Sequence, residues 1–133
     1  MLIDNFRSYL DSRNIQSTPF GEGNTSLSFT NNGLHYIFDA PGASDPYFFR
    51  LLLPGVEQAT VDNVQFLQQK ALRLSSEKKV AKAYILGNSV WISADCFVYG
   101  DSNINQLFER VIYLLEQSIS SYRNYSNQTE GER

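Results

Sequence analysis

His35 is the single histidine of the chain and its strongest candidate for acid–base chemistry. Asp39 follows it on the same face of an expected strand. A strand rises about 3.3 Å per residue, so the two Cα atoms would be about 13 Å apart. That distance is too long for a direct hydrogen bond, and no serine or cysteine stands beside them in a nucleophile motif. We therefore expect a solvent-facing histidine and no catalytic residues.

Cys96 is the single cysteine. Strand alternation places it on a face of small residues under a helix, where a thiol behaves as an inert apolar group. One cysteine and one histidine exclude a disulfide framework and a multi-histidine metal site within the chain. The glycine-containing segment 21–26 comes after a helix and before a strand, the reverse of a phosphate-binding loop. We expect no enzyme activity, no metal and no cofactor.

A group of cations gathers near the end of the expected middle helix: Lys70, Arg73, Lys78, Lys79 and Lys82. Cations there complement the helix dipole and need no ligand. The competing interpretation is an anion-binding site formed by the last four of them, which would make the protein a sensor of a small molecule or anion. The whole chain has 11 Lys and Arg against 14 Asp and Glu, a net charge of −3. That balance argues against nucleic-acid or membrane partners.

Large aromatic side chains fall outside the face that the pattern assigns to the core: Phe66, Tyr84, Trp91, Phe97 and Tyr99. Phe66 lies opposite the apolar stripe of its helix, and the other four lie on the second face of an expected sheet. Exposed aromatic patches are typical of protein contacts. The alternative is a second core layer covered by the middle helix. We predict dimer or partner contacts at these positions.

The elements that must position these residues are readable from their periodicity. Ile3, Phe6 and Leu10 have helical spacing near the start of the chain. Apolar residues then alternate over 27–30 and 34–39, around the Asn32-Gly33 dipeptide that favours a type I′ turn. We expect this turn to pair Phe29 with Tyr36 and Leu27 with Phe38. A third strand should cover 47–53 and end at Pro54-Gly55, after a loop over 40–46.

The second half of the chain is expected to form a helix, a hairpin and a last helix. A helix is expected over 61–78 with Thr60 as its N-cap. Gly87-Asn88 then predicts a hairpin in which Tyr84 pairs with Trp91. The last helix should span 104–122, started by a capping box of Asn103 and Gln106. The order α-β-β-β-α-β-β-α predicts an α+β sandwich with a mainly antiparallel, five-stranded sheet.

The length of 133 residues, 42% of them apolar, suits one folded domain. We expect that domain to span residues 1–123, followed by a polar, flexible tail over 124–133. Asp4 and Arg7 stand where a signal peptide would need an apolar run, and the densest apolar stretch is too short to cross a membrane. The expected location is the cytoplasm.

Several strings resemble those of YbjN-like proteins. They are Asp-Pro-Tyr-Phe-Phe-Arg-Leu-Leu-Leu-Pro over 45–54, Lys-Val-Ala-Lys-Ala-Tyr-Ile-Leu over 79–86, and Val-Trp-Ile-Ser-Ala-Asp over 90–95, followed by a long amphipathic helix. The resemblance spans Met1 to about Tyr122. These strings are structural, so they specify a fold better than an activity.

The YbjN-like family in turn resembles the class I type III secretion chaperones in its order of elements. Those chaperones are small, acidic, cytoplasmic homodimers that hold partner polypeptides in an extended form. The resemblance implies a dimer built largely around the middle helix and the adjoining strand surface, and a fold of type III secretion chaperone type. Together with the aromatic surplus, it predicts a non-enzymatic, homodimeric protein-binding module, chaperone-like or adaptor-like, with an unidentified protein partner. Apolar grooves and strand edges would accept the partner.

Overall fold

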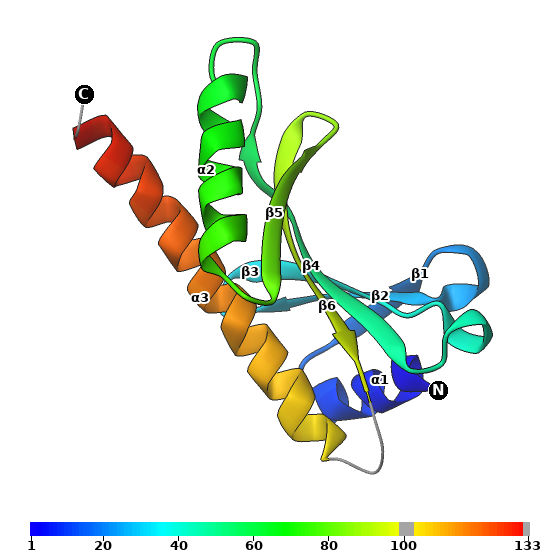
Figure 1. Ribbon diagram of the computed structural model, residues 1–133. Coiled ribbons are helices and arrows are strands. Elements are labelled where there is room, and N and C mark those ends of the chain that lie inside the picture. The colour runs from blue at the N-terminus through cyan, green and yellow to red at the C-terminus, as the bar shows by residue number, and fades with distance from the viewer. Residues whose placement is uncertain (99–102, 132–133) are drawn as a thin grey trace.

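The computed structural model describes residues 1–98 and 103–131, with side chains as far as Tyr125. Six antiparallel strands form one twisted sheet in the order β1-β2-β3-β4-β6-β5 (Figure 1). The strands are β1 Ser17–Phe20, β2 Ser26–Asn31, β3 Leu34–Asp39, β4 Phe48–Gln58, β5 Ala81–Leu86 and β6 Ser89–Phe97. The helices are α1 Leu2–Ser12, α2 Val64–Glu77 and α3 Ile104–Gly131, with short 3₁₀ turns η1 Glu22–Asn24 and η2 Gly42–Ser44. The α+β class is confirmed, with six strands instead of five.

Both expected hairpins form in the expected register. Asn32 and Gly33 have φ angles of 52° and 76°, as a type I′ turn requires. Across that turn Phe29 pairs with Tyr36. In the second hairpin, β5 and β6 pair across residues 87–88 from Ala81↔Ala94 to Leu86↔Ser89. Local turn chemistry therefore determines both registers.

Two strand predictions are wrong. The pattern predicts no strand over the residues of β1, yet β1 pairs with β2 from Ser17↔Phe29 to Phe20↔Ser26. It also ends β4 at Pro54-Gly55, yet the strand continues to Gln58 through a register shift between Leu53 and Glu57. A β-bulge accommodates proline and glycine inside a strand, because the bulged residues leave the regular ladder.

The helix boundaries also differ from expectation. α2 begins at Val64, because Thr60 and Asn63 bond each other's backbone N–H groups at 2.7 and 3.3 Å one turn earlier. At α3, the Asn103 side chain accepts a hydrogen bond from the Gln106 N–H at 3.4 Å, as predicted. α3 continues to Gly131, beyond the expected end at Tyr122, and Tyr125 in the expected polar tail is buried.

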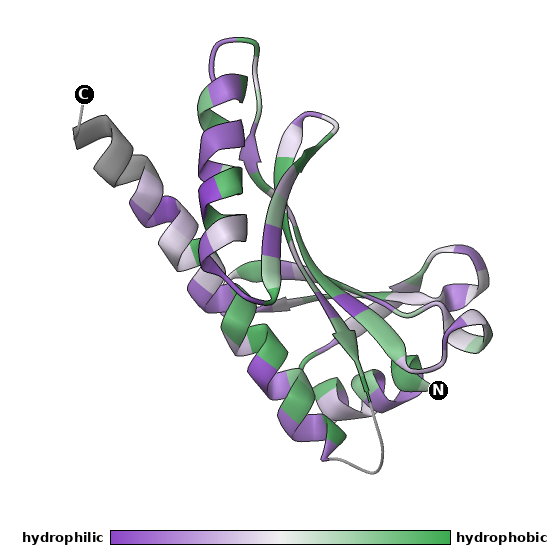
Figure 2. Ribbon diagram, viewed as in Figure 1, coloured by the Kyte–Doolittle hydropathy of each residue, from purple (hydrophilic) through white to green (hydrophobic). Residues whose placement is uncertain are grey.

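An aromatic cluster forms the core between the sheet and the helices. Phe6 of α1 stacks on Phe38 of β3 at 4.1 Å between ring centroids and meets the ring edge of Phe108 of α3 at 4.8 Å. All three rings are fully buried. Figure 2 shows hydrophobic segments along β4 and on the part of α3 beside α1. The three helices lie toward one face of the sheet (Figure 1), which leaves the opposite face as the place to look for a site.

Candidate functional site

The strand registers place a set of large side chains together on the face of the sheet away from the helices, which we call the open face. Directly paired residues share a face, so Phe48↔Phe97 and Arg50↔Asp95 form adjacent rows across β4 and β6. The large and acidic side chains of the open face include Phe20, Ile37, Asp39, Phe48, Arg50, Leu52, Tyr84, Trp91, Asp95 and Phe97. Smaller or polar residues lie on the same face: Thr18, Ser26, Ser28, Thr30, His35, Lys82 and Ser93. No helix covers it within the described part of the chain.

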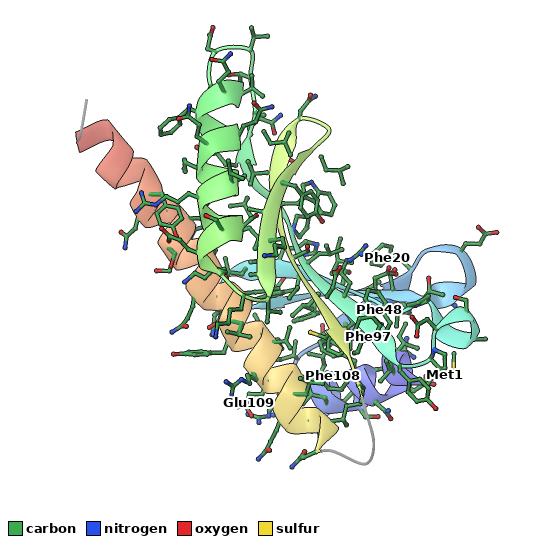
Figure 3. All side chains as sticks on the ribbon, in the orientation of Figure 1. Met1, Phe20, Phe48, Phe97, Phe108 and Glu109 are labelled. Carbon is green, nitrogen blue, oxygen red and sulfur yellow. The ribbon has the colours of Figure 1, made fainter. Side chains whose placement is uncertain are left out.

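Phenylalanine side chains gather at one end of the open face. Phe48 and Phe97 contact each other with ring centroids 5.2 Å apart, and Phe20 comes to the same side from β1 (Figure 3). Phe97 is 53% exposed and Phe20 is 40% exposed. Rings of this size at such exposure form an apolar surface on rigid strands.

An ion pair occupies the middle of the open face. Arg50 donates from Nε to Asp95 Oδ1 at 2.6 Å and from Nη2 to Asp95 Oδ2 at 3.2 Å. The hydrogen bond to Asp95 raises the pKa of Arg50 further above its ordinary value. The guanidinium also lies 5.7 Å from the Phe48 ring centroid. The adjacent Asp39 carboxylate accepts a hydrogen bond from Ser26 Oγ at 2.8 Å.

Tyr84 and Trp91 pair across β5 and β6 at the other end of the open face. Both are half-buried, and Trp91 donates from Nε1 to Ser89 Oγ at 3.1 Å. α2 packs on the opposite face, where Ala81 and Ala83 are buried. The alternative of a second core layer under the middle helix is therefore wrong for these strand aromatics.

Phe66 lies apart from the open face. It is half-buried on α2 and lines a small cavity with Gln69, Lys70, Arg73 and Tyr125. The Lys70 ammonium is 5.5 Å from its ring centroid. The structure thus separates Phe66 from Tyr84, Trp91 and Phe97, and Tyr99 lies outside the described residues.

Lys70 is not part of an exposed cation cluster. Lys70 is 3% exposed, bonds Glu57 Oε1 at 3.0 Å and lies 4.0 Å from the Tyr122 ring centroid. Tyr122 donates a hydrogen bond to the same Glu57 oxygen at 2.9 Å. Lys70 is therefore part of a partly buried polar group between α2, β4 and α3. The sequence pattern does not reveal this role, because Glu57 lies beyond the expected end of its strand.

The other cations have mostly structural contacts. Arg73 bonds Glu77 at 3.1 Å and stacks 4.1 Å from the Tyr125 ring centroid. Lys82 donates to the backbone oxygens of Ser75 and Lys78 at 2.9 and 3.3 Å, at the end of α2. These contacts match the helix-dipole interpretation of the cluster.

The other reactive side chains stay separate from one another. His35 is exposed and pairs with Thr30 across the hairpin. Cys96 is half-buried, and burial together with the nearby Asp95 charge raises the pKa of its thiol to about 11. The described residues contain no group of three or more potential metal ligands of the His, Cys, Asp or Glu type. No helix of the described part of the chain is long and apolar enough to cross a membrane.

Several open-face residues are not singled out by the sequence pattern. Phe48 and Arg50 lie in a run that the pattern predicts to be buried on both faces, so their exposure is unexpected. The available signal is Arg50 itself, because a charge inside an apolar run marks the face that reaches water. Phe20 could not be assigned to this face, because the sequence pattern does not predict β1.

Comparison with known proteins places this architecture in the class of YbjN-like folds. The crystal structure of YbjN from E. coli, a proposed transcription regulator, superposes with a TM-score of 0.63 at 15% sequence identity, and the match covers 96% of this chain and 93% of that one. No protein-family model matches the sequence. No curated protein matches it by sequence either. The likeness to YbjN concerns the fold.

Proposed function

We propose that this protein is a non-enzymatic protein-binding module, chaperone-like or adaptor-like, that uses its open face as the contact surface. The observation that carries the proposal is the surplus of half-exposed aromatic side chains on that face. A sheet face that is exposed to solvent normally carries polar residues. Here Phe48, Leu52, Trp91 and Phe97 stand on that side among its serines and threonines.

The chemistry of the open face suits a protein interface. Aromatic residues and arginine are enriched at the energetic centres of interfaces, while lysine and glutamate are depleted. Arg50 stands between an aromatic row and the aliphatic Leu52, held by two hydrogen bonds to Asp95. Side chains held on strands lose little freedom when a partner binds, which favours affinity.

We further propose that the protein forms a homodimer through α2, as its resemblance to the secretion chaperones implies. Leu72 on α2 is 71% exposed, which supports a contact there. Phe66→Asp should then shift the protein toward monomer in sedimentation velocity, with Asn105→Asp, at an exposed position of α3, as the control. A Phe66→Asp protein that sediments as the wild type does would contradict this assignment.

The test of the binding surface is co-purification from the cells that make the protein. The tagged wild type should recover a stoichiometric partner, and Phe97→Asp should lose it. Tyr113→Asp is the matched control, because Tyr113 is an aromatic residue of similar exposure, 56%, on α3. Equal recovery by the two variants, or recovery of no partner by the wild type, would contradict the proposal.

Other functions have less support. An anion sensor would rest on Arg73, Lys78, Lys79 and Lys82, but Arg73 and Lys82 have the structural contacts described above. Transcription regulation, the role proposed for YbjN, is compatible with a protein-binding module if the regulation works through protein contacts. The net charge of −3 disfavours direct binding to DNA.

A further inference from the structure

The β5 edge of the sheet is already occupied by a side chain from α2. In the β5–β6 hairpin, Leu86 and Ser89 flank a two-residue turn, so the alternate residues Ala83 and Ile85 direct their backbone groups outward. Ser75 Oγ accepts a hydrogen bond from the Ala83 N–H at 2.9 Å and donates one to the Ala83 carbonyl at 3.1 Å. A partner strand would have to displace this hydroxyl before it could pair with β5.

The β1 edge is protected from strand addition in a different way. The same alternation in the β2–β3 hairpin makes Thr18 and Phe20 the residues that bond β2. Pro19 therefore lies on the outward side, where it has no N–H to offer. β1 is also only four residues long. Short strands and proline are the usual protection of a sheet edge against added strands.

One carboxylate of the open face is hydrogen-bonded to a neutral group. Arg50 directs both of its bonded nitrogens at Asp95, at 2.6 and 3.2 Å. Asp39, next to Arg50 in the same row, is bonded to the Ser26 hydroxyl. Lys82 is on this face too, but its ammonium bonds the carbonyls at the end of α2. Two carboxylates thus share one guanidinium, and the local charge favours a cation.

We propose that the partner docks as an amphipathic helix laid across the open face, with a lysine or arginine of its apolar side placed against Asp39. The inference rests on the proposed function and specifies the partner. A helix satisfies its own backbone hydrogen bonds and needs no sheet edge. It would add a third layer to the sheet and cover the phenylalanine row, Leu52 and Trp91.

The test uses synthetic peptides as probes and Trp91 as the reporter, since it is the single tryptophan of the chain. The first peptide is a helix with a leucine stripe, one lysine in the centre of that stripe and glutamine elsewhere. The second replaces the lysine by glutamine. The third has the same composition as the first in alternating, strand-forming order. Binding is titrated by the shift in Trp91 emission.

We expect the lysine helix to bind and the strand-forming peptide to bind at least tenfold more weakly. Replacing the peptide lysine by glutamine should weaken binding about fivefold, the size of a partly exposed ion pair. That loss should vanish in Asp39→Asn and persist in Asp62→Asn, a control outside the sheet. The Asp39→Asn protein should keep the wild-type circular dichroism spectrum.

Three results would each overturn the inference: no binding of the lysine helix, equal binding of the strand-forming peptide, or a lysine effect that persists in Asp39→Asn. If the variant proves misfolded, a glutamate helix on the wild type decides, because it must bind more weakly than the glutamine helix. The proposed function is tested separately by the Phe97→Asp co-purification. If Phe97→Asp loses the partner but no helical peptide binds the wild type, the proposed binding function holds and the helical partner is excluded.

Discussion

The two faces of the sheet are made from the same strands and have opposite surroundings. On β4, Phe49 and Leu51 are fully buried under the helices, while Phe48 and Arg50 alternate with them on the open face. Both faces are rich in aromatic residues. The number of aromatics therefore does not tell a core from an interface; the covering layer does, and α1, α2 and α3 all lie toward one side (Figure 1).

The largest difference between the faces should appear in stability. Phe108→Ala should lower the free energy of unfolding by about 3–5 kcal/mol, because a cavity would form in the aromatic cluster. Its ring is fully buried and lies 4.8 Å from that of Phe6. Phe97→Ala should cost about 1 kcal/mol or less, because its ring is 53% exposed. Urea denaturation measures both, and similar losses would mean that the open face is part of the core.

A smaller effect is expected from the polar group on the covered side. Lys70→Ala should lower the free energy of unfolding by about 2 kcal/mol, because it leaves the Glu57 carboxylate without its cation. The loss is smaller than for a fully buried pair, because the Glu57 side chain is 36% exposed. Lys79→Ala, at an exposed lysine, should change stability by less than about 0.5 kcal/mol. The Lys70→Ala/Glu57→Gln double variant should recover part of the loss. A harmless Lys70→Ala would show that the pair contributes nothing to folding.

Removal of the hydroxyl should lower the free energy of unfolding by about 1 kcal/mol more at Tyr122 than at Tyr36, although both are buried. Tyr122→Phe removes a bond to Glu57 of 2.9 Å and should lower stability by that amount. The Tyr36 hydroxyl is buried and has no hydrogen bond of normal geometry among the described residues, but burial and the nearby Glu116 carboxylate raise its pKa, so Tyr36→Phe should cost clearly less than Tyr122→Phe. Thermal and urea unfolding of the two variants give the comparison. A loss in Tyr36→Phe as large as that in Tyr122→Phe would contradict it.

The rate of thiol labelling should differ between the covered face and the open face, and it can be measured on the folded protein. Burial raises the pKa of Cys96 to about 11, so about one thiol in a thousand is ionised at pH 8. Its labelling by an aromatic disulfide should be slow and should rise about tenfold per pH unit up to that pKa. A thiol introduced next to it by Phe97→Cys, with Cys96→Ala, should react more than about a hundredfold faster. Fast labelling of Cys96 at pH 8 would contradict its burial.

The parts of this fold that depend on neighbouring residues were predictable from the sequence. Both hairpins have the expected register, because Asn32-Gly33 and Gly87-Asn88 determine their turns locally. β1 was not predictable, because a four-residue strand containing Pro19 has no internal pattern and depends on β2 for its bonds. The continuation of β4 past Pro54-Gly55 depends likewise on its pairing with β6.

The candidate site was predictable in part for the same reason. Alternation correctly groups Tyr84, Trp91 and Phe97 on one face, because a strand has a strict period of two. It cannot group Phe66 or Lys70, whose surroundings come from elements distant in sequence. Lys70 meets Glu57 and Phe66 shares a cavity with Tyr125, and both of those partners lie beyond element ends that the sequence places too early.

The hydrogen bonds between Ser75 and Ala83 have a consequence for synthesis of the chain. The two residues are eight positions apart, so they leave the ribosome almost together. β5 emerges from the ribosome a few residues ahead of β6 and would otherwise present two bare edges to nascent chains on the same messenger RNA. The serine hydroxyl can occupy one of them as soon as Ala83 has emerged. The order of emergence thus shields the strand before its permanent neighbour in the sheet is in place.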